Sequence, residues 1–483
     1  MTINRIASNK KIQAEQIAKI TAGKLIGNNS FLKLNGYTIA SFAVESGDLF
    51  IALPGEKQNG WDFAFEACER GAAAILTEKA LPEIKIPQIL VPSTLEALTN
   101  WARKNRQESN AVFIAITGSS GKTTTKEMTR AILEESQIPF FCNPGNLNSQ
   151  VGAPFSMLGL TLQEKIALLE IGMSSPGEIA NLTKLINPSI ALITNIGHAH
   201  LKNFQNTEGI TNAKGELIKE MDPSGTLFLN RDNKHYLQLC GFSNKQSLFD
   251  FSISNPSAYL YAGNIETSLE KSSFDLYRAG QYLDRVSIEI SGRSNISNAL
   301  AAIGIISAIG IDHAVAIEGL KKFRPVAQRS MLLKLPLWKS YLLDDTYNAG
   351  FESVLEALKI VQLERDRTPI FIFGDMLELG LSSEKLHSAI GIQVAKNRMK
   401  IFLTYGKMSN FSQRAFQKNY HQGIGRHFSA LEELNNFLRE INLSFSVILV
   451  KGSRSMKMEQ VVKRIISIYD QNTGDQSFIP NIE

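Results

Sequence analysis

A glycine loop between a predicted strand and a predicted helix is the most constraining feature of this chain, VFIAITGSSGKTTT at residues 112–125. β-Branched and apolar residues lead into the loop, and Lys122 opens the helix. In such a loop the backbone N–H groups face an anion, the helix N-terminus adds positive charge, and lysine and threonine side chains reach phosphates and Mg²⁺. The alternative is a glycine and serine turn without a ligand. The order of these features favours a nucleotide site formed by Gly118, Ser119, Ser120, Gly121, Lys122, Thr123 and Thr124.

The loop is shorter than the usual phosphate-binding pattern, in which the two glycines are five positions apart. Here Gly118 lies three positions before Gly121, and Ile116 occupies the place of the usual first glycine. This short form, preceded by Thr117, resembles the loop of the Mur ligases and the folylpolyglutamate synthases. The resemblance implies an ATP-dependent amide ligase with ATP and Mg²⁺ as cofactors.

Length and composition bound the class of protein. At 483 residues the chain is expected to form about three domains, and 43% hydrophobic with 20% charged residues is typical of a globular protein. The net charge of +5 is small for this length and is not gathered into a long basic run. We therefore expect no nucleic-acid partner.

Neither a disulfide framework nor membrane insertion is predicted. Cys68, Cys142 and Cys240 are too scattered for a disulfide framework or a CxxC metal site, which fits a reducing cytoplasm. The N-terminal residues lack the apolar segment of a signal peptide. The longest apolar run, residues 299–311, is broken by glycine and serine and is too short to span a bilayer, so we predict a packed helix there.

Strands alternate with helices along most of the chain, which predicts an α/β fold with parallel sheets covered by helices. We predict a small α/β N-terminal domain (residues 1–92), a central P-loop ATPase domain with a parallel sheet (residues 93–325) and a C-terminal Rossmann-like domain (residues 326–483). The segment SGDLFIALPGEKQNGWDFAFEACERGAAAILTE resembles the UDP-binding domain of the Mur ligases, which assigns the UDP-linked precursor to the first domain. Residues 41–43, Ser-Phe-Ala, replace a turn that many members carry, so no uracil-contacting residue is assigned.

Polar residues follow two further strands of the predicted central sheet. Glu170 ends the apolar run IALLE, and His200 lies just beyond IALITNI; ligands of α/β sheets bind at such strand ends. On the residues alone, a structural strand-end carboxylate is an equally good interpretation of Glu170, and a structural role is the better interpretation of His200. The resemblance to the Mur ligases implies that both residues hold Mg²⁺ together with Thr123, with His198 as a less favoured rival in the same loop.

Lys214 begins a predicted helical turn in ITNAKGEL. By itself it would be interpreted as a solvated surface lysine. In the Mur ligases an equivalently placed lysine is carbamylated by CO₂, which turns a cation into a metal-binding carboxylate. The resemblance therefore implies a possible carbamate here, a catalytic set of Lys122, Glu170, His200 and Lys214, and a metal site of Thr123, Glu170, His200 and Lys214.

The C-terminal domain carries the most specific sequences, LLDDTYNAG, FGDMLELG with His387 downstream, and LVKGSRSMKMEQVV. Together they resemble the Mur ligase branch that joins D-alanyl-D-alanine to the UDP-linked tripeptide. Lys451, Ser453 and Arg454 form a cationic loop suited to a carboxylate or phosphate, with a solvated basic turn as the alternative. The resemblance adds Asn295, Asn298, Arg329 and Asp345 as nucleotide contacts and Asn146 as a substrate contact.

Some of these positions have a second interpretation. A helix beginning near Asn295 would place Asn295 and Asn298 in its first turn, where asparagine caps are favoured. Near Asp345, the sequence NAGF at residues 348–351 and Gln328 depart from the usual sequences of the branch. We expect these departures to reshape the dipeptide pocket or the hinge without removing a charged group.

The resemblance also implies a reaction. The carboxylate ending the UDP-MurNAc-tripeptide attacks the γ-phosphate of ATP, and the amine of D-Ala-D-Ala attacks the resulting acyl phosphate, which yields the pentapeptide precursor of peptidoglycan. We expect a cytoplasmic monomer. The alternatives are another amide ligase of the same fold, such as a folylpolyglutamate synthase, and a nucleotide-gated binding protein that has lost catalysis. The GDMLELG and KGSRS sequences argue against the first alternative, and the intact loop and metal-ligand residues argue against the second.

Overall fold

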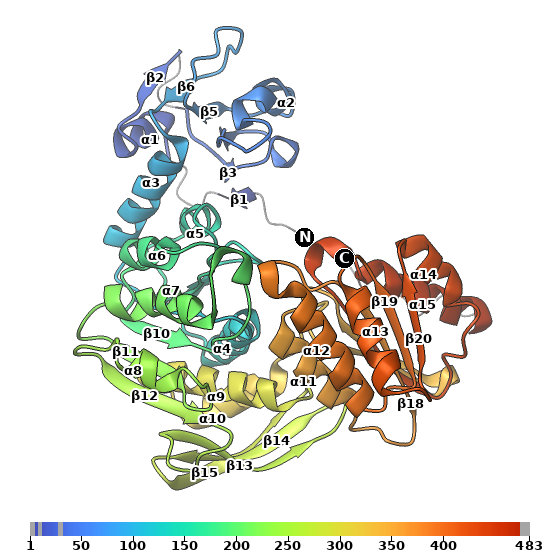
Figure 1. Cartoon of the computed structure of the whole chain (residues 1–483). Coiled ribbons are helices and arrows are strands. Elements are labelled where there is room, and N and C mark those ends of the chain that lie inside the picture. Colours follow the sequence, from blue (N-terminus) through green and yellow to red (C-terminus); the bar gives the residue numbers. More distant parts are fainter. Residues whose placement is uncertain (1–4, 8–11, 28–31, 474–483) are drawn as a thin grey trace. The chain divides into compact units, whose positions relative to one another are not determined.

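The computed structural model describes residues 5–7, 12–27 and 32–473. The described chain has three sheets with helices packed on them, which confirms the predicted α/β class (Figure 1). Two compact units are present, Met1–Ile116 with Gln137–Ala191 and Lys219–Gly225, and Thr117–Ser136 with Leu192–Ile218 and Thr226–Glu483. The domain boundaries after residues 92 and 325 stay predictions.

The first sheet has six short strands in the order β1-β3-β4-β5-β6-β2. β3 to β6 are parallel, and β1 and β2 pair antiparallel at the edges. Side chains alternate between two cores, since Leu49 and Ile51 join the cluster of α1 and α3 whereas Phe50 joins that of α2. The elements are β1 (Arg5–Ala7), α1 (Ala14–Ile20), β2 (Lys24–Ile26), β3 (Gly36–Thr38), η1 (Ser41–Ala43), β4 (Asp48–Ile51), η2 (Gly60–Phe63), α2 (Ala64–Glu69), β5 (Ala74–Thr77), β6 (Gln88–Leu90) and α3 (Thr94–Glu108).

Helix α3 leads into the strand before the glycine loop, as the sequence predicts. The Ser93 hydroxyl caps it by accepting a hydrogen bond from Glu96 N at 3.2 Å. Leu98 and Trp101 lie on its buried face, and the Trp101 ring meets Tyr37 edge-on at 4.7 Å between centroids. The helix is thereby anchored to the first sheet.

The second sheet has the strand order β15-β14-β13-β12-β11-β10-β7-β9-β8. β7, β8 and β9 are parallel, as are β11, β12 and β13. β13, β14 and β15 are antiparallel, an extension that the alternation of strands and helices did not predict. Its last hairpin turns at Ala279 and Gly280, both with positive φ, the geometry favoured in two-residue hairpins.

The strands of this sheet and the helices between them have the following bounds: β7 (Val112–Thr117), α4 (Lys122–Ser136), β8 (Phe140–Cys142), α5 (Gly152–Met157), β9 (Ile166–Glu170), α6 (Glu178–Ile186), β10 (Ile190–Ile193), η3 (Leu201–Asn203), α7 (Thr207–Glu220), β11 (Thr226–Asn230), α8 (Tyr236–Cys240), β12 (Ser247–Ser252), β13 (Leu260–Thr267), β14 (Ser272–Arg278), β15 (Gln281–Ile288), α9 (Arg293–Ala308) and α10 (His313–Lys322).

Helix α9 contains most of the apolar run for which a packed helix is predicted. It is buried on nearly every side from Ile296 to Ile306, and the chain turns at Gly310, which has a φ of 78°. Within the described part of the chain, no helix is long and apolar enough to cross a membrane.

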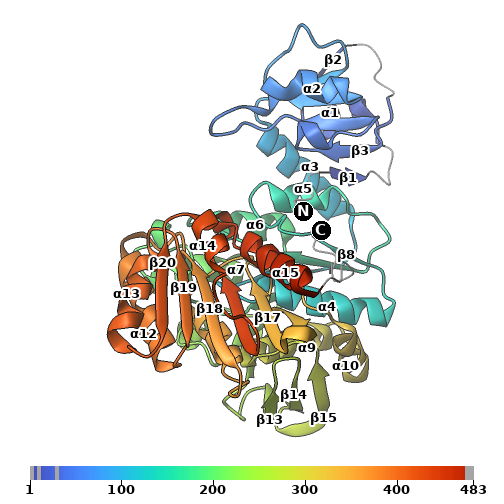
Figure 2. The same ribbon diagram turned by 90° about the vertical axis from the view of Figure 1, so that its right-hand side faces the viewer.

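The third sheet has the order β16-β17-β21-β18-β19-β20, in which β16 is antiparallel and the others are parallel. Figure 2 shows its strands side by side. Ile370 and Ile372 join the core formed with α14 and α15, whereas Phe371 and Phe373 stack with Phe402 on the other face. Helices therefore cover both faces, as the Rossmann-like prediction requires.

The elements of this sheet are β16 (Met331–Leu335), η4 (Pro336–Trp338), β17 (Ser340–Asp345), α11 (Phe351–Val361), β18 (Thr368–Gly374), η5 (Gly380–Ser382), α12 (Ser383–Lys396), β19 (Ile401–Tyr405), α13 (Ser409–Asn419), β20 (Ile424–Phe428), α14 (Leu431–Phe437), β21 (Ser446–Lys451), η6 (Arg454–Met456) and α15 (Glu459–Thr473).

Candidate active site

The glycine loop (residues 118–121) lies between β7 and α4, as predicted. Gly118 has a φ of 153° and Gly121 a φ of 81°, a region that glycine enters without strain. A Cβ on Gly118 would lie 1.9 Å from Thr194 Oγ1, and one on Gly121 would lie 2.4 Å from Asn298 Oδ1. Both glycines are therefore required by the backbone conformation and by close neighbours.

The segment after β10 braces the glycine loop. Ser119 N donates to Asn195 O at 3.0 Å, and Ser120 N donates to Asn195 Oδ1 at 2.8 Å. Thr194 Oγ1 donates to Ser120 O at 2.6 Å, and Gly197 N donates to Ser119 Oγ at 2.9 Å. Two loop N–H groups thus hold the loop in shape, whereas the glycine motif predicts that they face the nucleotide.

Lys122 and Thr123 begin α4 directly after the loop. Lys122 Nζ donates to Gly118 O at 2.8 Å, so the ammonium group lies over the loop. The Thr123 side chain is largely buried, and that of Thr124 is half-buried. This arrangement places a cation and a helix N-terminus at one point, which suits an anionic ligand.

Lys214 on α7 is not a surface residue. It is 1% exposed, which rules out the interpretation as a solvated lysine. Burial, and then the positive charge of Lys122, hold the pKa of Lys214 well below its usual value. The structure therefore brings together the two lysines that the resemblance assigned to catalysis.

Glu170 is the last residue of β9, and its register partner on β7 is Ile116. It is 2% exposed, and its Oε1 accepts a hydrogen bond from Asn148 Nδ2 at 2.7 Å. Asn143 bonds both the N–H and the C=O of Glu170, each at 2.9 Å. These two asparagines were missed, and the only signal was their place in an asparagine-rich loop. Asn146 in that loop is exposed.

The histidine loop (residues 197–200) contacts two carboxylates that the sequence analysis did not assign. His198 N and Nδ1 both bond the carboxylate of Glu352 on α11. His200 Nδ1 lies 2.6 Å from Glu378 Oε2, an ion-pair distance. Burial raises the pKa of Glu352, but its bonds with His198 outweigh this effect and leave the pKa below its usual value. The contact with His200 lowers the pKa of Glu378 in spite of partial burial.

The predicted substrate residues of the C-terminal sheet differ in exposure and in their partners. Lys451 is 2% exposed, and its Nζ bonds Asp345 Oδ2 at 2.5 Å, so these two charges neutralise each other. Ser453 Oγ accepts from Leu377 N at 2.8 Å and thus supports the GDMLELG loop. Arg454, in the KGSRS sequence with Lys451 and Ser453, is exposed.

The guanidinium of Arg329 lies 3.8 Å from the centroid of the Tyr347 ring, and that of Arg454 lies 5.8 Å from it. Arg454 also bonds the side-chain oxygen of Gln328 at 2.5 Å. Gln328, which differs from the usual residue of the branch, therefore bonds Arg454, a predicted substrate residue.

Asn295 and Asn298 lie inside α9, because the helix begins at Arg293 with Gly292 as its cap. The helix therefore starts near Asn295 as predicted, but the interpretation of an asparagine as its cap is wrong. Asn295 Nδ2 donates to Ser291 O at 2.7 Å, and Asn298 Nδ2 donates to Asn295 Oδ1 at 3.2 Å. Asn298 adjoins the glycine loop, as its proximity to Gly121 shows.

No group of three His, Cys, Asp or Glu side chains among the described residues could hold a metal ion. A site with few protein ligands still fits Mg²⁺, because this ion keeps several waters and usually takes one or two carboxylates together with substrate phosphates. Glu170 and the Thr123 hydroxyl are oxygen donors of that kind.

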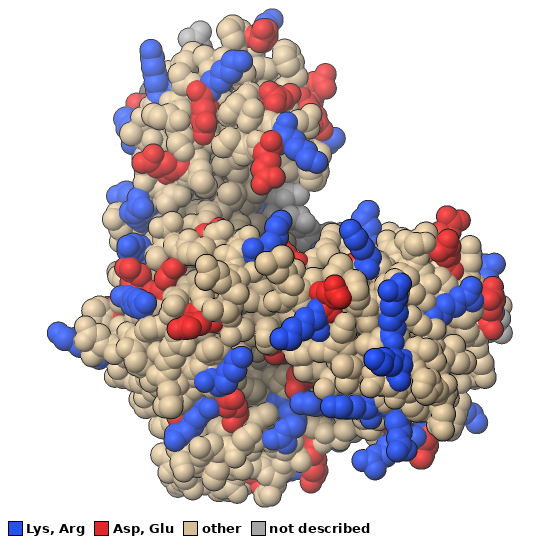
Figure 3. Space-filling view, viewed as in Figure 1, with Lys and Arg blue, Asp and Glu red and all other residues tan. Residues whose placement is uncertain are grey.

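On the face in Figure 3, Lys and Arg side chains are interspersed with Asp and Glu.

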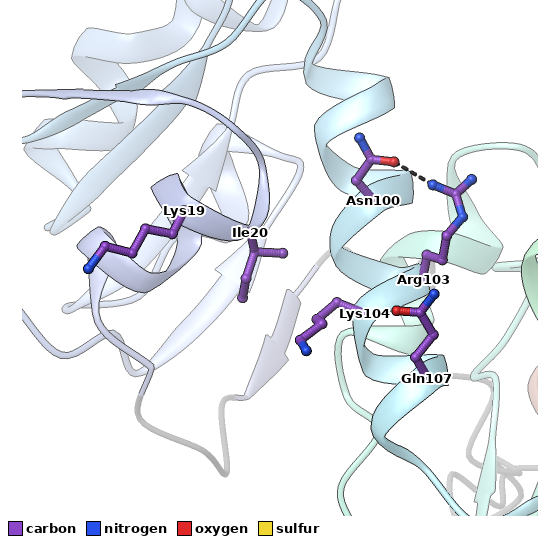
Figure 4. A pocket seen from close by; sticks show the side chains of 6 residues that line it. All are labelled: Lys19, Ile20, Asn100, Arg103, Lys104 and Gln107. Carbon is purple, nitrogen blue, oxygen red and sulfur yellow. Dashed lines mark hydrogen bonds between the residues drawn. The ribbon is translucent and has the colours of Figure 1, made fainter.

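A pocket of about 410 Å³ on the first unit lies between α1 and α3 (Figure 4). Its cations are partly neutralised, since Lys19 pairs with Glu15 and Lys104 with Glu108. It contains none of the predicted site residues, and we assign it no role. Its lining residues are Lys19, Ile20, Asn100, Arg103, Lys104 and Gln107.

Family models of the Mur ligases and curated Mur ligases are similar to this chain. The Mur ligase middle domain matches residues 116–306, and the Mur ligase family catalytic domain matches residues 33–106. The UDP-N-acetylmuramoyl-tripeptide–D-alanyl-D-alanine ligase of Buchnera aphidicola is 35% identical over 94% of this chain and 98% of its own length. The ligase of the same name from Escherichia coli is 33% identical with the same coverage.

Solved structures match along nearly the whole chain. MurF from Acinetobacter baumannii has a TM-score of 0.85 at 27% identity and covers 94% of this chain and 98% of its own. MurF from Thermotoga maritima in complex with ADP has a TM-score of 0.78 at 25% identity and covers 90% and 98%. With these matches and the glycine loop in place, the chain belongs to the Mur ligase family.

Proposed function

We propose that this chain is the ATP-dependent ligase that adds D-alanyl-D-alanine to the UDP-MurNAc-tripeptide in peptidoglycan synthesis. The observation that carries the proposal is identity of 33–35% over 94% of the chain to ligases of that name. The braced glycine loop with Lys122 above it supports the use of ATP. A folylpolyglutamate synthase shares the fold at 13% identity and a TM-score of 0.61, so that alternative is not favoured.

The reaction has two steps. A carboxylate oxygen of the tripeptide forms a bond to the γ-phosphorus of ATP as the bond from that phosphorus to the ADP oxygen breaks. The amine nitrogen of D-Ala-D-Ala then forms the amide bond, loses a proton, and inorganic phosphate leaves. Because such transfers depend on positioning and charge, the work of the protein is to orient the reactants and neutralise phosphate charge.

Each predicted residue has a proposed part. The glycine loop with Thr124 holds the phosphates, and Lys122 neutralises negative charge that develops during transfer. Mg²⁺, when bound, would neutralise negative charge on the phosphates. Thr123, Glu170, His200 and Lys214 would hold it. Asn295, Asn298, Arg329 and Asp345 are proposed for the nucleoside, and Asn146, Lys451, Ser453 and Arg454 for the substrates.

Lys214 is proposed to be carbamylated. Its burial and lowered pKa favour the neutral amine, which is the form that attacks CO₂. The amine nitrogen bonds the carbon of CO₂ and releases a proton, which leaves an anionic carbamate with two oxygens. A buried cation thereby becomes an oxygen ligand of the kind that Mg²⁺ prefers.

This proposal predicts that Lys214→Ala loses nearly all turnover and is partly restored by a small added carboxylic acid that supplies the missing oxygens. The measurement is ADP release with and without acetate or propionate. Lys219→Ala, on the same helix, is the matched control and should behave as the wild type. Full activity of Lys214→Ala would rule out the carbamate.

Cys68, Cys142 and Cys240 form no disulfide bond in the described structure, which fits the proposed cytoplasmic location. A monomer is proposed.

The experiment that distinguishes the proposed ligase from its alternatives measures ADP release with a panel of UDP-linked peptides, with and without D-Ala-D-Ala. ADP release that depends on both substrates supports the proposal, whereas release with folate substrates would favour the synthase, and nucleotide binding without release would favour an inactive binding protein.

A further inference from the structure

Glu378 contacts the segment after β10 at two points, one at His200 and one at Lys202. Its Oε2 lies 2.6 Å from the buried Nδ1 of His200, and its backbone oxygen accepts a hydrogen bond from Lys202 N at 2.8 Å. Glu378 belongs to the GDMLELG sequence after β18, whereas His200 follows β10. Side chain and backbone therefore hold the histidine loop from a segment distant in sequence.

Both partners have unusual backbone conformations. His200 and Glu378 each have a φ of 63°, in the left-handed region that residues with a Cβ seldom adopt. Such conformations persist where the surroundings hold them, and they cluster at functional sites. The surrounding structure therefore sustains the backbone cost of both residues.

The segment that carries Glu378 is itself fixed from behind. Met376 N donates to Nε2 of the buried His387 at 3.0 Å, and Leu377 N donates to Ser453 Oγ at 2.8 Å. His387 Nδ1 donates to Ser383 O at 2.8 Å, which leaves Nε2 as the acceptor for Met376. Glu378 is thus presented by a loop whose preceding residues are already bonded.

We propose that Glu378 is a positioning residue for His200, holding the imidazole with Nδ1 toward its carboxylate and Nε2 free for a divalent cation. Metal-binding histidines commonly have a carboxylate on the other ring nitrogen, which fixes tautomer and orientation. The inference rests on the proposed function, in which His200 is a metal ligand. It adds that a residue of the GDMLELG sequence supports the metal site through His200.

The test uses Mn²⁺ with ADP as the probe and measures free Mn²⁺ by electron paramagnetic resonance. Glu378→Gln should weaken Mn²⁺ binding about 10- to 100-fold, the usual effect of losing such a partner. Glu384→Gln is the control, because it removes an exposed carboxylate from the first turn of α12, six positions after Glu378, and should leave Mn²⁺ affinity unchanged. Glu378→Asp keeps the charge at shorter reach and should fall between Glu378→Gln and the wild type.

A second readout is the ¹⁵N spectrum of histidine-labelled protein, with His200→Gln to assign the signal. Glu378→Gln should shift the His200 nitrogens toward a mixture of tautomers, an effect that a merely structural role would not produce. Wild-type Mn²⁺ affinity with an unchanged His200 signal in Glu378→Gln would overturn the proposal. The proposed function fails by a different result, absence of ADP release by the wild type with both substrates. Melting temperatures confirm that the variants fold.

Discussion

The glycine loop and the histidine loop contribute to the same proposed site but are held in different ways. The glycine loop is braced by Thr194 and Asn195 from the end of the adjoining strand, and its shape follows from Gly118 and Gly121. The histidine loop is held by Glu352 and Glu378, which lie more than 150 positions away along the chain. The glycines of the first loop thus set its backbone conformation locally, with braces from the neighbouring strand, whereas the second loop depends on carboxylates from more distant segments.

This difference predicts how each loop responds to a substitution that removes a charge. Removing a charge from the glycine loop should stop the chemistry without moving the fold, since the braces stay in place. Removing a carboxylate from the histidine loop should change the orientation of an imidazole and leave the glycine loop intact. The predictions below test this contrast, from the largest expected effect to the smallest.

The largest effect is expected at Lys122. Lys122→Ala should lower turnover about 10³-fold, because removal of one preorganised donor at developing charge costs about 10²–10³ in kcat and here the donor is a full cation. The melting temperature should change little, since the Lys122 side chain is half-buried on the loop. Steady-state ADP release provides the measurement, and Lys165→Ala, which removes an exposed lysine before β9, serves as the control. Near-normal ADP release by Lys122→Ala would show that the phosphate site is misplaced.

A smaller effect is expected at Asn195, the brace of the glycine loop. Asn195→Ala removes the acceptor of the half-buried Ser120 N, and since a lost hydrogen bond costs about 1 kcal/mol, distortion of the loop should lower turnover about 5- to 10-fold. Asn233→Ala, which removes one bond to Ile196 O, is the control and should have a weaker effect. Measurement of KM for ATP and of kcat separates loop distortion from loss of chemistry. Equal effects of the two variants would contradict the role of Asn195 as the main brace.

The smallest effect concerns stability and extends the comparison to two adjacent carboxylates. Asp345 has the Lys451 partner, whereas Asp344 is buried beside it with hydrogen bonds only from Thr346. Burial, aided by the charges of Asp345 and Glu459, raises the pKa of Asp344 to about 6 although the Thr346 bonds lower it. Since this pKa is above that of the unfolded chain, the folded protein binds an extra proton between about pH 4 and 6.

Asp344 therefore destabilises the folded protein increasingly as pH rises through that window, and fully above pH 6. Asp344→Asn should raise the free energy of unfolding at pH 8 by up to about 3 kcal/mol, since one pKa unit corresponds to about 1.4 kcal/mol. The gain should shrink as pH falls toward 4. Urea unfolding at pH 8 and pH 5 measures both values, and a gain that is the same at the two pH values would exclude titration of Asp344 as the cause.

The sequence was sufficient for those features that depend on neighbouring residues. The strand, glycine loop and helix at residues 112–136 form as predicted, because glycine conformations and helix starts are decided within a few residues. Alternating strands and helices likewise predicted three α/β parts. The antiparallel β13–β15 extension was missed, since its pairing depends on hairpins rather than on a motif.

The tertiary structure alone decided the environment of each charge. Lys214 would be a surface residue by sequence and is 1% exposed, whereas Lys451 is neutralised by Asp345 and Arg454 remains exposed. Glu352 and Glu378 became partners of the histidines because the folded chain brings distant strand ends together. Residue type determines which charge is available, but burial and distance determine its pKa and its partner, and both depend on contacts between residues far apart in the sequence.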